Sequence, residues 1–148
     1  MLLILYDGTC HKMKAMNNKR YTASEYEEFL CQEIVDCSFQ VHQELGPGLL
    51  EKIYEVCFCH ELSKRNIPFC RQVKLPILYD GLVFDEGLIL DVLVDDLLIV
   101  EIKAKKDINP VYEAQLLSHV RLAGLHIGFL INFHVALIKD GIRRFSTA

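Results

Sequence analysis

Two acids and one lysine are the residues of this sequence best suited to chemistry. Asp91 comes just before the apolar residues 92–94, and Glu101-Ile102-Lys103 comes just after the apolar residues 97–100. A carboxylate beside such buried segments is costly unless something binds it. In a strand, Glu101 and Lys103 point to one face and Ile102 to the other. The sequence therefore predicts a carboxylate and an ammonium group side by side on one surface.

Asp91 can join this pair in only one register of the hairpin. A two-residue turn at Asp95-Asp96 would pair Asp91 with Val100 and turn its side chain away from Glu101. A three-residue connection, or a bulge, would pair Asp91 with Glu101. We predict the second arrangement.

Two carboxylates that converge would repel each other unless a divalent cation lies between them. Mg²⁺, with Mn²⁺ as a substitute, suits oxygen ligands from one or two carboxylates, water and a phosphate. Such an ion lowers the pKa of a bound water. Lys103 could hold that water or neutralise developing charge. On spacing alone, a surface hairpin with an inconsequential Glu–Lys pair explains the pattern equally well.

The surrounding sequence predicts the elements that position these residues. Two helices precede the hairpin, the first with a capping box at Thr22 and Glu25. The apolar strands of the hairpin indicate a sheet covered on both faces. Asn109-Pro110 is typical of a helix start. The expected helices cover residues 25–45, 49–65 and 110–123, and the expected strands residues 69–79, 82–84, 89–94, 97–103, 126–133 and 135–139, the last continuing through 143–145. This order predicts an α/β domain with a central sheet flanked by helices.

Length and composition narrow the class of protein. The 148 residues suit one domain, which we expect over residues 21–148, with residues 1–20 an extension that the core does not require. A net charge of −4 argues against coating nucleic acid by bulk positive charge. The apolar residues 1–5 are too few to span a membrane and resemble no signal sequence, so we expect a cytoplasmic protein without a membrane partner.

The six cysteines favour reduced thiols in the core over a set of disulfides. Cys57, Cys59 and His60 do not have the spacing of a zinc site.

A resemblance to a known family strengthens the functional interpretation. Gly48-Leu-Leu-Glu51-Lys-Ile-Tyr54 resembles the signature of the GxxExxY proteins, a small prokaryotic family within the PD-(D/E)XK nuclease superfamily. Further similar segments follow in the family's order over residues 25–145. They are residues 41–48, 91–94, 99–104, 114–117 and 128–133. The resemblance implies a restriction-endonuclease-like core with a central mixed β-sheet flanked by α-helices.

The resemblance also implies roles for individual residues. Asp91 and Glu101 would be metal ligands and Lys103 the catalytic lysine. Glu51 would supply a further acidic group to the metal, although a solvated helix glutamate fits as well. Gln115 would lie near the site from the following helix, or else be a buried glutamine bonded to backbone. We expect Tyr54 in the core.

The sequence departs from the family pattern at two places within this stretch. His119 stands one turn after Gln115, where a tyrosine is more usual, and it could hydrogen-bond there although a lone helix histidine is usually structural. Asp85-Glu86 stands where a basic residue is expected before the metal-binding aspartate.

The leading hypothesis is a Mg²⁺-dependent nuclease that hydrolyses phosphodiester bonds in DNA or RNA. The alternative is a catalytically silent nuclease-like module that binds nucleic acid or a protein partner. The chain could also pair as a homodimer. Several basic residues would form either a phosphate-contacting rim or an ordinary solvated face. They are Lys103, Lys105, Lys106, Lys139, Arg143 and Arg144.

Overall fold

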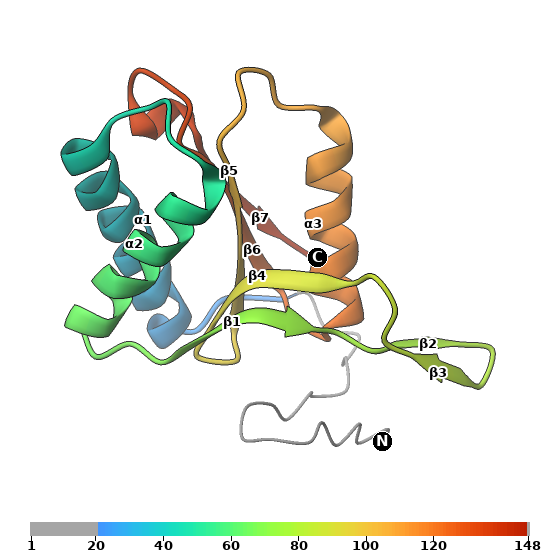
Figure 1. Ribbon diagram of the computed structural model, residues 1–148. Helices are drawn as coiled ribbons and strands as arrows, with labels where there is room; N and C mark the ends of the chain where they lie inside the picture. Colours follow the sequence, from blue (N-terminus) through green and yellow to red (C-terminus); the bar gives the residue numbers. More distant parts are fainter. Residues whose placement is uncertain (1–20, 148) are drawn as a thin grey trace.

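The computed structural model describes residues 21–147, which fold into a sheet covered by helices on both faces (Figure 1). The helices are α1 (Glu25–Leu45), α2 (Glu51–Lys64) and α3 (Pro110–Leu122), with a short 3₁₀ helix, η1 (Ile138–Asp140). The strands are β1 (Phe69–Lys74), β2 (Ile77–Tyr79), β3 (Leu82–Phe84), β4 (Ile89–Val94), β5 (Leu98–Lys103), β6 (Ile127–Asn132) and β7 (Ile142–Ser146). The expectation that residues 1–20 are a dispensable extension lies outside the described residues.

The main sheet is mixed, as predicted. Its five strands lie in the order β1-β4-β5-β6-β7. Only β5 and β6 run parallel, with α3 as the connection between them, and the other neighbours are antiparallel. Strands β2 and β3 form a separate hairpin that projects from the main sheet in Figure 1. The structure thus has the α/β architecture of a restriction-endonuclease-like fold.

Each face of the sheet has its own apolar core. Helices α1 and α2 cover one face, where Tyr54 and Phe58 pack against β4, β5 and β6. Helix α3 covers the other face through Leu116 and Val120. Strand β5 is therefore buried on both sides, which explains the apolar residues 98–100 at its start.

Three local predictions were wrong. The strand expected over residues 69–79 is divided into β1 and β2, which lie in different sheets. The capping box lies two residues later than expected, because Ser24 and Glu27 make the reciprocal side-chain and backbone bonds that Thr22 and Glu25 were expected to make. Residues 135–139 are not a strand. Residues 135–137 form a loop and residues 138 and 139 begin η1, and the loop carbonyl of Val135 lies 2.8 Å from His42 Nε2. Short apolar segments leave such a choice open, and here the contact with α1 decides it.

The cysteine expectation holds in part. Cys31, Cys37, Cys57 and Cys59 are free thiols. Burial raises the pKa of Cys37 and Cys59 to about 12, so both are inert as nucleophiles. Cys70 is disulfide-bonded, contrary to the expectation.

Within residues 21–147, none of the helices is long and apolar enough to cross a membrane.

Candidate active site

Asp91 and Glu101 lie opposite each other on neighbouring strands. The ladder between β4 and β5 pairs Val92 with Val100 and Val94 with Leu98, so Leu97 is the extra residue in the connection. Continued by one position, this register places Asp91 beside Glu101. The predicted three-residue connection is therefore confirmed.

The side chain of Asp91 takes the place of a backbone partner. Its Oδ2 accepts a hydrogen bond of 2.9 Å from the backbone N–H of Ile102. The β4–β5 pairs end at Val92, so the two strands part at this carboxylate. This bond fixes Asp91 at the opening between the strands, next to Glu101.

The two acids influence each other electrostatically. Burial raises the pKa of Asp91 to about 7, and the neighbouring negative charge of Glu101 adds to the shift. The bond from Ile102 N–H opposes both effects but does not cancel them. Glu101 itself is only 8% exposed. Such a pair of carboxylates favours either a shared proton or a bound cation.

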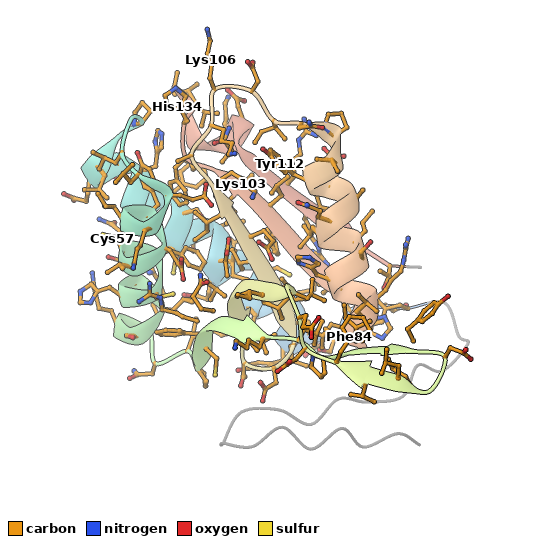
Figure 2. The ribbon with its side chains drawn as sticks, turned by 45° about the vertical axis from the view of Figure 1, so that its right-hand side comes forward. Cys57, Phe84, Lys103, Lys106, Tyr112 and His134 are labelled. Atoms are coloured by element: carbon orange, nitrogen blue, oxygen red, sulfur yellow. The ribbon has the colours of Figure 1, made fainter. Side chains whose placement is uncertain are left out.

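Lys103 lies on the α3 side of β5, and its ammonium group faces an aromatic ring. Its Nζ is 4.5 Å from the ring centroid of Tyr112, in the first turn of α3. Figure 2 shows both residues between β5 and α3. The ring stabilises the cation electrostatically and limits where the amine can point. Tyr112 was not singled out from the sequence, because only the packing of α3 shows which strand its ring meets.

His119 contacts Glu101, which lies two residues before Lys103 on β5. Its Nδ1 lies 3.2 Å from Glu101 Oε1, and the residue is half-buried. The histidine thus contacts a candidate ligand from the position at which the resemblance led us to expect a tyrosine. Tyr112 and His119 are seven residues apart, which places both on the face of α3 that looks at β5.

The two remaining predicted site residues, Glu51 and Gln115, lie on helices beside this pair of strands. Glu51 is the first residue of α2 and is half-buried. Gln115 is exposed on α3, between Tyr112 and His119. Among the residues that the structure describes, no group of three or more histidine, cysteine or acidic side chains is gathered closely enough to hold a metal ion. Glu51 therefore does not share such a ligand group with Asp91 and Glu101.

Glu55 is a buried acid that the sequence analysis missed. It lies one turn after Glu51, is 7% exposed, and contributes to the raised pKa of Asp91. Arg71 Nε lies 3.2 Å from its Oε1, and Gln72 Nε2 lies 3.0 and 3.1 Å from its two oxygens. Gln72 has a left-handed backbone, with φ at 51°. A glutamate four residues after Glu51 on a helix with apolar neighbours was the available signal.

The carboxylate oxygens of Asp91 and Glu101 are the kind of donor atoms that a hard divalent cation binds. Mg²⁺ is commonly held by one or two protein carboxylates, with water and substrate phosphate completing its coordination. Because the described side chains offer no group of three or more such donors, water and the substrate would have to complete the coordination of any cation held here.

A comparison with known protein families agrees with this arrangement. A family model described as the PD-(D/E)XK nuclease superfamily matches residues 28–145, which include both strands of the site, helices α2 and α3, and all but the first turn of α1. Searches of curated proteins and of solved structures found no match. The match covers most of the sequence, and the mixed sheet flanked by helices is the fold expected for it. The chain belongs to the PD-(D/E)XK nuclease superfamily.

Proposed function

We propose that this protein is a metal-dependent nuclease that hydrolyses phosphodiester bonds in DNA or RNA. The observation that carries the proposal is the register of β4 and β5, which sets Asp91 beside Glu101. Membership of a nuclease superfamily supplies the class of substrate. Nucleases of this superfamily generally depend on a divalent metal.

Asp91 and Glu101 would hold the cation, which we propose to be Mg²⁺, with Mn²⁺ as a substitute. When bound, such an ion lowers the pKa of a coordinated water and stabilises negative charge on the phosphate. The pKa of Asp91 is raised by burial and, to a smaller extent, by the charge of Glu101, and a bound cation would offset both effects.

The chain's own side chains would perform the positioning. Lys103, restrained by Tyr112, would hold the attacking water or neutralise an oxygen of the phosphate. His119 would keep Glu101 oriented.

Glu51 and Gln115 have supporting roles in this proposal. Glu51 would act on the site through water, because it does not share a ligand group with the two acids. Gln115 would orient the site from α3, where its exposed amide lies between Tyr112 and His119.

We also propose that the chain is a member of the GxxExxY group. The tyrosine of that signature, Tyr54, is fully buried and holds the loop that leads into α2. Its hydroxyl donates to Gly46 O at 2.6 Å and accepts from Leu49 N at 3.1 Å. This contact sets the start of the helix that carries Glu51.

Incubation of the purified protein with labelled DNA and RNA in Mg²⁺, Mn²⁺ or EDTA tests the nuclease proposal. We expect cleavage with either ion, none in EDTA, and a loss of at least about a hundredfold in Asp91→Asn and Glu101→Gln, because both remove a charge that the ion needs. Glu86→Gln makes the same chemical change at an exposed position and should retain activity. A wild-type protein that binds nucleic acid but cleaves none with either ion would contradict the proposal and support a silent binding module.

A further inference from the structure

Lys105 is an exposed lysine whose backbone is held in place on both sides. The side chain of Asn132, only 4% exposed, makes two bonds to it. Asn132 Oδ1 accepts from Lys105 N at 3.1 Å, and Asn132 Nδ2 donates to Lys105 O at 2.8 Å. Two residues earlier, Lys103 O accepts from Phe133 N at 2.9 Å. Residues 103–105 lie at the end of β5 and just beyond it. These three bonds fix them to the end of the neighbouring strand, β6.

The side chain of Lys105 is restrained as well. Its Nζ lies 5.3 Å from the ring centroid of Tyr112, the same ring that faces Lys103. Hydrogen bonding with the Tyr112 side chain raises the pKa of Lys105, because the contact favours the charged amine. One tyrosine thus gathers two ammonium groups at the carboxyl end of β5. An exposed lysine would otherwise sample many rotamers, and ordering it on binding has an entropic cost.

Lys106 provides a natural contrast. It is the next residue along the chain and is also exposed, but its side chain points away from the Tyr112 ring (Figure 2). The two lysines therefore carry the same charge within one loop and differ in whether a neighbouring side chain holds the ammonium.

From this geometry we infer that Lys105 is a preorganised binding residue for a backbone phosphate next to the one that is cleaved. This inference rests on the proposed function, since it assigns Lys103 to the phosphate at the site. A nucleic-acid strand carries one negative charge per nucleotide, so two cations fixed around one ring can meet neighbouring phosphates. In a protein with a net charge of −4, such a local pair supplies attraction that the whole surface does not. Contact with phosphate alone predicts binding that is independent of base sequence.

Metal-free binding tests the inference separately from cleavage. The probe is a fluorescein-labelled single-stranded DNA of mixed sequence, and its anisotropy is followed in EDTA over a series of KCl concentrations. Lys105→Gln should weaken binding several-fold at low salt and reduce the slope of log K against log salt by about 1. The same effect is expected for a second DNA sequence. Lys106→Gln, which removes the same charge, should produce a smaller change in both quantities.

Tyr112→Phe tests whether the restraint matters. It removes the hydroxyl next to Lys105 and keeps the ring that faces Lys103. We expect weaker binding in the single variant, and no further loss when Tyr112→Phe is added to Lys105→Gln, because both act through one ammonium group.

Several outcomes would overturn the inference. They are equal salt slopes for the Lys105→Gln and Lys106→Gln proteins, an additive effect of Tyr112→Phe, and a wild-type protein that binds no DNA without metal. Wild-type protein that binds as described but fails to cleave with Mg²⁺ or Mn²⁺ would reject the nuclease proposal and leave the phosphate site standing. Cleavage that proceeds with unaltered binding in Lys105→Gln would do the reverse.

Discussion

The carboxylate of Asp91 binds the backbone N–H of Ile102, the residue that follows Glu101 on the neighbouring strand. This bond closes the end of the β4–β5 ladder with a side chain in place of a backbone carbonyl. It also holds Asp91 beside a second acid in a place where burial penalises its charge. A bound cation would therefore be favourable at this site. Without one, the charged form of Asp91 is destabilised.

The raised pKa of Asp91 predicts that the stability of the metal-free protein depends on pH. The pKa of Asp91 is about 7 in the folded protein, against 3.8 for the unperturbed group. Between these values the folded state keeps a proton that the unfolded state has lost, so stability falls as pH rises, by up to about 1.4 kcal/mol per pH unit. Asp91→Asn cannot titrate and can still accept the bond from Ile102. In EDTA, urea unfolding should show the variant gaining stability relative to wild type as pH rises toward 7, with the difference constant above it. A difference that does not vary with pH would contradict this prediction.

A bound divalent ion should offset the loss of stability that ionised Asp91 causes. Mg²⁺ or Mn²⁺ that binds only the folded state stabilises it by RT ln(1 + c/Kd), where c is the free metal concentration, so the melting temperature rises with metal concentration. We expect such a rise in wild-type protein and in Glu86→Gln, and none in Asp91→Asn or Glu101→Gln. Because protons compete for Asp91, the rise should be larger above pH 7 than below it. Differential scanning fluorimetry with increasing metal concentration measures it, and an equal rise in Glu101→Gln would place the ion elsewhere.

The centre of the site could be read from the sequence because strand alternation is a strict rule. Once Glu101 and Lys103 lie in a strand, they share a face, and the number of residues in the turn fixes where Asp91 falls. Asp95 and Asp96 both have positive φ angles, and Leu97 is the added residue that brings the two acids together. The apolar sequences of β4 and β5 likewise predicted a sheet covered on both faces.

The contacts made from the helices could not be read in this way. The distances from His119 to Glu101 and from Tyr112 to Lys103 depend on how α3 is rotated against the sheet, which local sequence does not determine. The pairing of Glu55 with Gln72 depends on an unusual backbone angle in β1. The first helix could be located but its cap could not, because Thr22 and Ser24 both had a glutamate three residues later.

His119 offers a test of a contact made from α3. Asparagine can place an amide nitrogen near the position of Nδ1, whereas leucine cannot hydrogen-bond to Glu101. We expect His119→Asn to retain most of the cleavage rate and His119→Leu to lose about 10- to 100-fold in metal affinity or activity, the usual range for residues that orient a metal ligand. Metal titration by calorimetry separates the two effects. Equal behaviour of the two variants would show that the contact with Glu101 does not matter.

Tyr54 should matter for stability through its hydroxyl. Tyr54→Phe keeps the ring stacked on Phe133, with centroids 4.6 Å apart, but removes both bonds to the Gly46–Leu49 loop. The loop is only partly buried, so water can replace the missing partner, and the loss should be about 1 kcal/mol of unfolding free energy. Tyr79→Phe, at a residue that is 72% exposed, is the matched control and should have no measurable effect. Urea unfolding of the two variants side by side makes the comparison.

Gly128 determines how closely α3 approaches the sheet, and so where its site residues lie. A Cβ at this position would stand 2.8 Å from both Leu116 Cδ1 and Val120 Cγ2, two buried atoms of the α3 core. Gly128→Ala should therefore destabilise the fold by about 1–3 kcal/mol, the usual cost of adding a methyl group to a filled core. Val120→Ala removes one of the clashing atoms, so the double variant should lose less than the sum of the two single losses. Because α3 also carries Tyr112 and His119, we expect Gly128→Ala to slow cleavage even at temperatures where the protein stays folded. Full activity at those temperatures, in a protein with a lowered melting point, would show that the helix can shift without disturbing the site.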